Sequence, residues 1–228
     1  MLRLEAIRLR RGDFVLEADC EIGARGTVAV IGPSGGGKST LLSLVAGFEV
    51  PDAGRVLWQG ADLGPLPPGK RPVAMLFQDN NLFPHLDVLT NVALGISPRG
   101  RPDGAALRRA REALGRVGLD GLEARRPGEL SGGQQSRAAL ARVLLTDRPV
   151  VLMDEAFSAL GPGLRTDMLE LVAELLPETL ILMVTHDPED AKRWAPMTVF
   201  VEGGRVHPPA ATHDLFADPP EALSLYLA

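Results

Sequence analysis

The sequence predicts an α/β protein with a mostly parallel sheet, an antiparallel N-terminal β-subdomain and an inserted α-helical subdomain. Short apolar runs alternate with helical patterns along most of the chain, which is typical of parallel strands joined by helices. The first residues instead alternate apolar and polar side chains, which is typical of half-exposed antiparallel strands. Residues 79–137 carry helical patterns without strand-like runs, which indicates the insertion.

The expected elements follow one another from the N-terminus. LRLEAIRL at 2–9 and FVLEAD at 14–19 read as antiparallel strands. The continuous apolar run TVAVIG at 27–32 predicts a strand that is buried on both faces. The helix that follows it is expected to end at Gly47. Further strands are expected at 54–60, 72–78, 149–154 and 179–186, helices at 105–118, 134–145, 164–176 and 188–195, a hairpin at 197–206, and two short helices within 212–228.

Length and composition limit the class of protein. A chain of 228 residues, 45% of them hydrophobic, allows one large domain. We expect residues 1–228 to form it, with 79–137 as the helical subdomain. The net charge of −5 does not suggest a broad basic surface, so no nucleic-acid partner is expected. The single cysteine, Cys20, excludes a disulfide within the chain, fits a reducing compartment and is expected to be buried.

The N-terminus and the apolar runs argue against a membrane-embedded chain. MLRLEAIRLRR at 1–11 carries charges throughout and lacks the apolar core of a secretory signal. The longest apolar runs, such as TLILMVTH, are strand-sized and far short of the ~18–20 residues that span a bilayer. We expect a soluble chain, which another chain would have to hold at any membrane where it works.

A glycine-rich segment after the buried strand predicts a phosphate-binding loop. GPSGGGKST matches the pattern G-x-x-x-x-G-K-[ST] and comprises Gly32, Pro33, Ser34, Gly35, Gly36, Gly37, Lys38, Ser39 and Thr40. Glycines let backbone N–H groups point at phosphate oxygens, and the next helix adds its positive N-terminal end. Lys38 would reach the β- and γ-phosphates, and the Ser39 hydroxyl would bind Mg²⁺. Thr40 could donate to the α-phosphate.

Polar residues at the ends of other strands supply the remaining chemistry. Asp154 ends an apolar strand and can hold Mg²⁺, and Glu155 beside it can act as the general base for water. His186 follows another buried strand, where a neutral imidazole can bond a γ-phosphate oxygen or the catalytic water. Gln78 ends the strand at 72–78, and its amide can orient water and bond groups on Mg²⁺.

LSGGQ at 130–134 predicts a second phosphate-binding helix start. Ser131 is placed as the helix N-cap, and Gly132, Gly133 and Gln134 follow it with exposed backbone N–H groups. One active site needs only one phosphate-binding helix start at the γ-phosphate. The second one, at LSGGQ, is therefore expected to bind the nucleotide of a neighbouring copy.

Together these motifs resemble the ATPase subunits of ABC transporters. The phosphate loop, Gln78, LSGGQ, VVLMDE and His186 occur in the order and spacing of that family, over essentially the whole chain. The resemblance implies the P-loop NTPase fold of an ABC cassette and a homodimer that sandwiches two ATP molecules with Mg²⁺. The phosphate loop of one subunit would face the LSGGQ of the other, with Ser131 and Gly133 on the partner's γ-phosphate.

The resemblance also implies catalytic roles and partners. Glu155 would be the base, His186 the switch, and Gln78 the link to an integral-membrane permease. The subunit would work peripherally, on the cytoplasmic face of the inner membrane.

Residues 71–98 are similar to the ATPases of proteobacterial thiamine importers, in the asparagine pair 80–81, LFPHL and LGISP. This similarity implies import of thiamine or thiamine phosphates and, indirectly, a periplasmic solute-binding protein. Two alternatives stay open, namely the ATPase of another small-solute importer and a nucleotide-binding module with weak turnover. Leu82, Phe83 and Leu86 either contribute to an apolar permease-docking surface or pack inside the subdomain.

Some positions depart from the family's pattern. Ala156 replaces the usual proline after the base, and Gly161 replaces an aspartate that normally helps to couple the two sites. QSR at 135–137 replaces the usual RQR, with Arg137 kept. These changes bear on loop stiffness and on the coordination of hydrolysis, whereas nucleotide binding is expected to persist.

The residue that stacks on adenine is a further departure. An aromatic side chain in the first hairpin usually takes this role, and the corresponding segment here is LRRGDF at 9–14. Arg10 or Arg11 could stack through the guanidinium plane, or Phe14 could reach the base.

Overall fold

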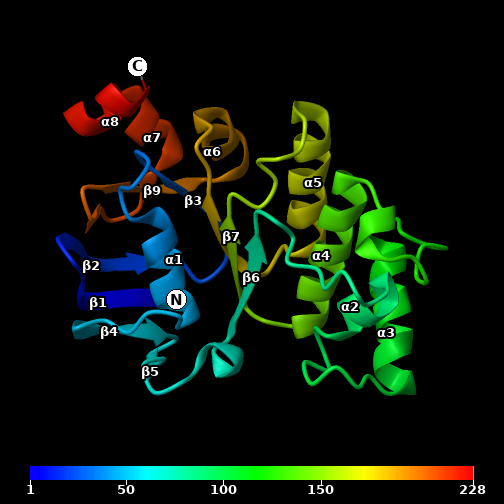
Figure 1. The fold of residues 1–228 in the computed structure, drawn as a ribbon. Coiled ribbons are helices and arrows are strands. Elements are labelled where there is room, and N and C mark those ends of the chain that lie inside the picture. Colours follow the sequence, from blue (N-terminus) through cyan, green and yellow to red (C-terminus); the bar gives the residue numbers. More distant parts are fainter. Residues whose placement is uncertain (228) are drawn as a thin grey trace. The chain divides into compact units, whose positions relative to one another are not determined.

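The computed structural model describes residues 1–227 and divides into two compact units (Figure 1). The first unit comprises Met1–Val73, Pro149–Asp154 and Glu178–Ala228, and the second comprises Ala74–Arg148 and Glu155–Pro177. Ala228 lies outside the described residues, so the last of the helices expected within 212–228 is described only to Leu227. The range 79–137 lies within the second unit, which extends further in both directions.

The first unit contains most of the sheet. Its strands are β1 (Leu2–Arg11), β2 (Phe14–Ile22), β3 (Gly26–Ile31), β4 (Ala53–Trp58), β5 (Ala61–Asp62), β7 (Val150–Asp154), β8 (Leu180–Val184), β9 (Met197–Glu202), β10 (Arg205–Val206) and β11 (Ala210–Ala211). They follow the order β5-β4-β1-β2-β10-β9-β3-β8-β7, with β11 on β9. The strands β9, β3, β8 and β7 run parallel, and β1 pairs antiparallel with β2 and β4, which confirms the predicted fold class.

Burial follows the two sequence patterns that predicted these strands. Every residue of β8 is buried, as is expected of an aliphatic strand covered on both faces. In β1, by contrast, Leu4 and Leu9 are fully buried while their neighbours are partly or fully exposed. The register of β1 shifts between Leu4 and Ile7, around Ala6, whose φ is 45°. The shift is a β-bulge that bends the strand locally.

Cys20 lies near the end of β2 and is 3% exposed. Burial raises the pKa of its thiol to about 11, so the thiol is protonated near neutral pH. The structure therefore confirms the prediction of a buried cysteine and gives it little thiolate character.

Helices cover the sheet of the first unit. They are α1 (Lys38–Ala46), α6 (Pro188–Trp194), α7 (Thr212–Ala217) and α8 (Glu221–Leu227), with a 3₁₀ turn at Pro68–Lys70. Helix α1 follows β3 and contacts β7 and β8. It ends at Gly47, whose φ of 88° and N–H contacts to the carbonyls of Ser43 and Leu44 form the expected helix stop.

The second unit is mainly helical. It contains β6 (Val73–Phe77) apart from its first residue, together with α2 (Val88–Ala93), α3 (Gly104–Arg116), a 3₁₀ turn at Pro127–Glu129, α4 (Gly132–Thr146) and α5 (Pro162–Leu175). Asp87 and Asp103 cap α2 and α3 through their side chains. Helices α2, α3 and α4 pack on one another and bury small and aliphatic residues, among them Ala110, Leu114 and Leu140.

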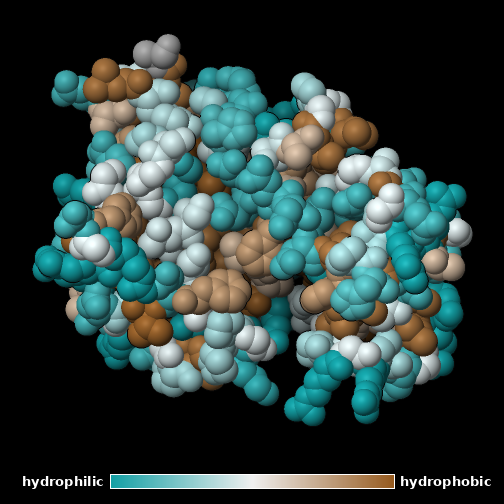
Figure 2. All heavy atoms as spheres, in the orientation of Figure 1, coloured by the Kyte–Doolittle hydropathy of each residue, from teal (hydrophilic) through white to brown (hydrophobic). Residues whose placement is uncertain are grey.

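One face of the molecule, shown in Figure 2, is mostly polar. On the face seen in Figure 2, hydrophilic side chains surround small, separate apolar patches. Among residues 1–227, the structure contains no helix that combines the length and the apolar character needed to cross a bilayer.

Candidate functional site

In the first unit, three neighbouring parallel strands bring predicted site residues to one edge of the sheet. Strand β8 lies between β3 and β7, and Val184 of β8 is in register with Val30 of β3 and Asp154 of β7. The glycine-rich loop begins directly after β3, and His186 follows β8. The carboxyl ends of these strands therefore place the loop, Asp154 and residues 185–187, here called the histidine segment, at the same edge. Ligands bind at this edge in α/β proteins.

Two glycines of the loop combine a positive φ with a lack of room for a side chain. Gly32 has a φ of 145°, and a Cβ there would lie 1.9 Å from the carbonyl oxygen of Val201 in β9. Gly37 has a φ of 113°, and its Cβ would lie 2.8 Å from a methyl carbon of Leu16. Both positions thus require glycine for backbone conformation and for close packing.

Lys38 places a cation inside the curl of this loop. The side chain is 8% exposed, and its Nζ donates to the carbonyl oxygens of Gly32 and Pro33 at 2.7 and 2.9 Å. Lys38 is also the first residue of α1, so the positive end of that helix points at the same place. The arrangement suits an anion with several oxygens, as predicted for a phosphate loop.

Ser39 and Asp154 form the part of the site that could hold a cation. The Ser39 hydroxyl donates to Asp154 Oδ1 at 3.1 Å. A hydroxyl and a carboxylate at this spacing fit Mg²⁺, which takes oxygen ligands and is usually bound through one or two protein groups plus phosphate oxygens and water. Within the described chain, no group of three or more His, Cys, Asp and Glu side chains could hold a metal.

His186 lies in a tightly bonded segment between β8 and α6. His186 itself is exposed, and Thr185 before it is buried. Thr185 Oγ1 donates to Asp190 Oδ2 and accepts from the N–H of Asp187, both at 3.0 Å. Asp187 in turn caps α6 by accepting from the N–H of Glu189. The backbone around the histidine is therefore fixed while its side chain faces solvent.

In the second unit, the LSGGQ segment opens α4 as the sequence predicted. Ser131 is the N-cap, and its Oγ accepts from the N–H of Gln134 at 3.3 Å. Gln134 Oε1 accepts from the N–H of Ser131 at 2.9 Å, which completes a capping box. Gly132 is exposed and Gly133 is partly exposed. The backbone N–H groups of this helix start are thus presented at the surface.

The second unit also contains Gln78, four residues after its first segment begins, and Glu155, the first residue of its second segment. Gln78 directly follows β6 and is exposed. Glu155 is partly buried and has a φ of 49°, an uncommon conformation for a residue other than glycine. Such outliers often accompany functional positions.

Ala156 and Gly161, the two positions after Glu155 that depart from the family's pattern, lie in different environments. Ala156 lies in the turn directly after Glu155 and is 5% exposed. Gly161 is the N-cap of α5, with a φ of −63°, no side-chain cap and no atom within 4 Å of where its Cβ would be. An aspartate at 161 would therefore fit without strain and would cap α5.

Arg71 was not predicted from the sequence as a site residue. It is 2% exposed and donates to the carbonyls of Leu44 and Val45, at the end of α1, and to that of Leu66. Burial lowers the pKa of this guanidinium. Arg71 thus caps the C-terminal end of the helix that carries Lys38 and Ser39. Its partners are backbone carbonyls, which carry no sequence signal.

Arg142 was likewise not predicted from the sequence as a residue that supports the asparagine pair. Its guanidinium donates to the carbonyls of Asn80 and Asn81 at 2.9 and 2.8 Å. Burial lowers the pKa of Arg142. Both asparagines have positive φ, 58° and 48°, which asparagine tolerates better than most residues. Arg142 thereby ties α4 to the segment that follows Gln78.

The three candidates for adenine stacking differ in their contacts. Arg11 forms an ion pair with Glu49, and the backbone N–H of Arg10 donates to Asp52 Oδ2 at 2.6 Å. Phe14 packs against the phosphate loop, because a Cβ on Gly37 would lie 3.0 Å from its Cζ atom. Its ring is thus an apolar surface directly beside the loop.

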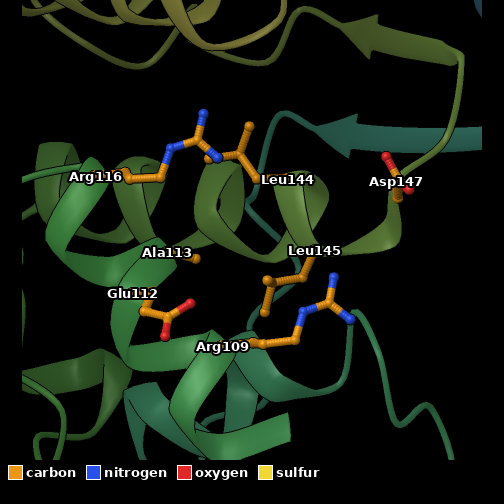
Figure 3. A pocket seen from close by; sticks show the side chains of 7 residues that line it. All are labelled: Arg109, Glu112, Ala113, Arg116, Leu144, Leu145 and Asp147. Carbon is orange, nitrogen blue, oxygen red and sulfur yellow. The ribbon is translucent and has the colours of Figure 1, made fainter. Parts of the chain in front are cut away.

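A separate cavity of about 290 Å³ lies between α3 and the end of α4 (Figure 3). It is lined by Arg109, Glu112, Ala113, Arg116, Leu144, Leu145 and Asp147. The two arginines and two carboxylates balance in charge. None of the predicted site residues lines this cavity, so it is not part of the candidate site.

Known proteins resemble the chain over most or all of its length. The family model described as ABC transporter matches residues 16–158. The chain is 58% identical to the thiamine import ATP-binding protein ThiQ of Cereibacter sphaeroides, across 100% of this chain and 99% of that protein. It is 55% identical to the ThiQ protein of a Ruegeria species, with the same coverage. The dimeric, post-hydrolysis structure of the ATP-binding cassette MJ0796 with ADP and Pi matches with a TM-score of 0.79 and 28% identity, over 93% of this chain and 99% of that one.

Proposed function

The chain belongs to the ABC transporter ATPase family, whose members bind and hydrolyse ATP, and from this premise we propose that it powers an importer of thiamine or thiamine phosphates. The observation that carries the proposal is the 55–58% identity to two thiamine import ATP-binding proteins over the whole chain. The similarity of residues 71–98 to the ATPases of thiamine importers also supports the proposal.

ATP is expected to bind with its phosphates in the loop of residues 32–40. Lys38 would exchange its bonds to the loop carbonyls for the β- and γ-phosphates, and Thr40 would donate to the α-phosphate. Phe14 is the proposed adenine-stacking residue, because its ring borders the loop at Gly37.

Mg²⁺ is the proposed metal cofactor, with Ser39, Asp154 and Gln78 as its protein contacts. The support is the Ser39–Asp154 hydrogen bond, which already pairs two suitable oxygen groups. When bound, the ion would supply charge neutralisation on the phosphate oxygens.

Hydrolysis is proposed to use Glu155 as the general base. Its carboxylate would take a proton from water as the water oxygen attacks the γ-phosphorus, and the bond to the ADP oxygen would break. Such a base typically contributes about 10²–10⁴-fold in rate. His186 would contact the γ-phosphate or the attacking water, and Gln78 would orient that water.

A homodimer is proposed as the working form. Ser131, Gly132, Gly133 and Gln134 would face the ATP of the partner subunit, since they present the N-terminal end of α4 at the surface. The similar cassette MJ0796 is dimeric in its post-hydrolysis state, which supports this arrangement. We further propose that residues 1–228 act as one ATPase domain, with 79–137 as the helical subdomain.

An integral-membrane permease is the proposed membrane partner. Exposed apolar side chains suited to docking occur in both units, with Phe48 and Val50 at 58% and 70% exposure and Phe83 at 45%. Leu82 and Leu86 are partly buried, which fits both docking and internal packing. The subunit would sit peripherally on the cytoplasmic face of the inner membrane, and a periplasmic binding protein would deliver the solute.

The test is the ATPase rate of the chain reconstituted with its permease and solute-binding protein in proteoliposomes. Thiamine-loaded binding protein should stimulate hydrolysis, whereas binding protein offered other small solutes should not. Stimulation by a different solute would favour the alternative importer. A rate at background level with every solute would favour the nucleotide-binding module with weak turnover.

A further inference from the structure

The C-terminal helix contacts the backbone of the histidine segment. Tyr226 of α8 donates its hydroxyl hydrogen bond to the carbonyl oxygen of His186 at 3.1 Å. The two residues are 40 positions apart in the chain. Tyr226 is also the single tyrosine of the sequence. The contact therefore joins the tail of the chain to a residue that the proposed function places at the γ-phosphate.

Helix α8 is anchored well enough to act as a support. Leu223 is fully buried in a cluster with Ile31, Ala191 and Phe200. Tyr226 packs against the same cluster. Ile31 is the last residue of β3, directly before the phosphate loop, and Ala191 belongs to α6, directly after the histidine segment. The helix thus rests on the two elements that carry the loop and the histidine.

The contact from Tyr226 acts on a different group from the hydrogen bonds within the histidine segment. Thr185 and Asp187, on either side of His186, are fixed by local bonds to each other and to the start of α6. The bond from Tyr226 acts on the carbonyl of His186 itself. This carbonyl belongs to the peptide unit that directly follows the Cα atom of His186, from which the exposed imidazole projects.

We propose that Tyr226 is a positioning residue for His186, through which the C-terminal helix holds the imidazole in its catalytic orientation. The inference rests on the proposed role of His186 in hydrolysis. A single hydrogen bond is worth about two- to tenfold in a rate or an equilibrium. Tyr226→Phe removes the hydroxyl and keeps the packing ring, so it should lower kcat by this factor and leave the KM for ATP unchanged.

Ser224 provides a matched control on the same helix. Its hydroxyl donates to the carbonyl of Pro219 at 3.2 Å, away from His186. Ser224→Ala should therefore leave kcat unchanged, and the melting temperatures of both variants should stay close to that of the parent protein. An unchanged kcat in Tyr226→Phe, or an equal loss in Ser224→Ala, would overturn the proposal.

A spectroscopic readout separates positioning from general loosening. The chain has four histidines, so their imidazole signals can be recorded on ¹⁵N-histidine-labelled full-length protein and assigned with His186→Ala. Tyr226→Phe should move the His186 signal, whereas Ser224→Ala should not. A His186 signal that stays in place in Tyr226→Phe would contradict the proposal.

Combining the variants distinguishes this inference from the function on which it rests. In the reconstituted complex, Tyr226→Phe should lower kcat no further once His186 is alanine. An additional loss in that background would show that Tyr226 acts elsewhere. If His186→Ala alone kept the full rate, the proposed role of His186 would fail, and the positioning role with it. If His186→Ala were impaired and Tyr226→Phe were not, only the positioning role would fail.

Discussion

The hydroxyl of Ser39 donates to Asp154 Oδ1 at 3.1 Å, across 115 positions of the chain. Ser39 stands in the first turn of α1 and Asp154 at the end of β7, and these two elements contact each other. Two motifs that are far apart in the sequence thereby meet. Because only Asp154 carries a charge in this pair, removing that charge should weaken the proposed metal site.

Asp154→Asn should raise the Mg²⁺ concentration needed for half-maximal ATPase activity. An interaction with an ionised group is worth about 1.5–3 kcal/mol, which corresponds to roughly 10–150-fold. A magnesium titration of the ATPase rate measures the shift. Asp147→Asn is the control, because Asp147 caps the end of α4 with a φ of 50° that asparagine also adopts. If the parent protein, Asp154→Asn and Asp147→Asn all showed the same magnesium dependence, Asp154 would not be a ligand of the metal.

Gly161→Asp should stabilise the protein slightly and raise or better synchronise turnover. The N-cap of α5 has space for the side chain, and replacing glycine with aspartate at an N-cap typically gains a few tenths of a kcal/mol. Denaturant unfolding measures the stability, and ATPase kinetics of the reconstituted complex measure the turnover. Gly161→Asn retains the cap without the charge. A faster rate in the aspartate variant alone would assign the effect to the carboxylate, and an unchanged rate would show that it is dispensable here.

Arg71→Leu should lower the free energy of unfolding by about 3 kcal/mol. The change removes the guanidinium donor from the carbonyls of Leu44, Val45 and Leu66, of which that of Leu44 keeps the N–H of Gly47 as a partner. Each buried carbonyl left unpaired costs about 1–3 kcal/mol. Arg55→Leu serves as the comparison, because the exposed Arg55–Glu5 pair should contribute no more than about 1 kcal/mol. Similar losses in urea unfolding of the two variants would refute the capping role of Arg71.

Phe14→Ala should weaken ATP binding about 5–150-fold, as expected for the loss of base–aromatic stacking worth about 1–3 kcal/mol. Arg11→Ala should have a smaller effect, because Arg11 is engaged by Glu49. Equilibrium binding of ATP, with inorganic triphosphate as the ligand that lacks a base, separates stacking from damage to the phosphate loop. Loss of triphosphate binding in Phe14→Ala would mean that the ring only supports the loop.

The fold class and the main motifs could be predicted because their signals are local. The buried run before Gly32, the glycine stop at Gly47 and the serine cap at Ser131 each depend on neighbours within a few residues. The short strands β5 and β11 were not predicted, because two residues carry no recognisable period. Their pairing depends on the neighbouring strands β4 and β9.

The supporting residues could not be predicted for a related reason. Arg71 and Arg142 bind backbone carbonyls up to 27 and 62 positions away, and Tyr226 binds the carbonyl of His186. Any residue supplies a carbonyl, so the sequence does not mark these partners. A buried arginine is uncommon, yet burial itself becomes visible only in the folded chain.

Glu155→Gln is the sharpest test of ATP hydrolysis by this chain, because the change removes the proposed base and keeps the shape of the side chain. Turnover in the reconstituted complex should fall by about 10²–10⁴-fold while ATP still binds. Glu178→Gln, which alters an exposed carboxylate paired with Arg25, should hydrolyse ATP at the parent rate. Turnover that survives in Glu155→Gln would contradict the assignment of Glu155 as the base.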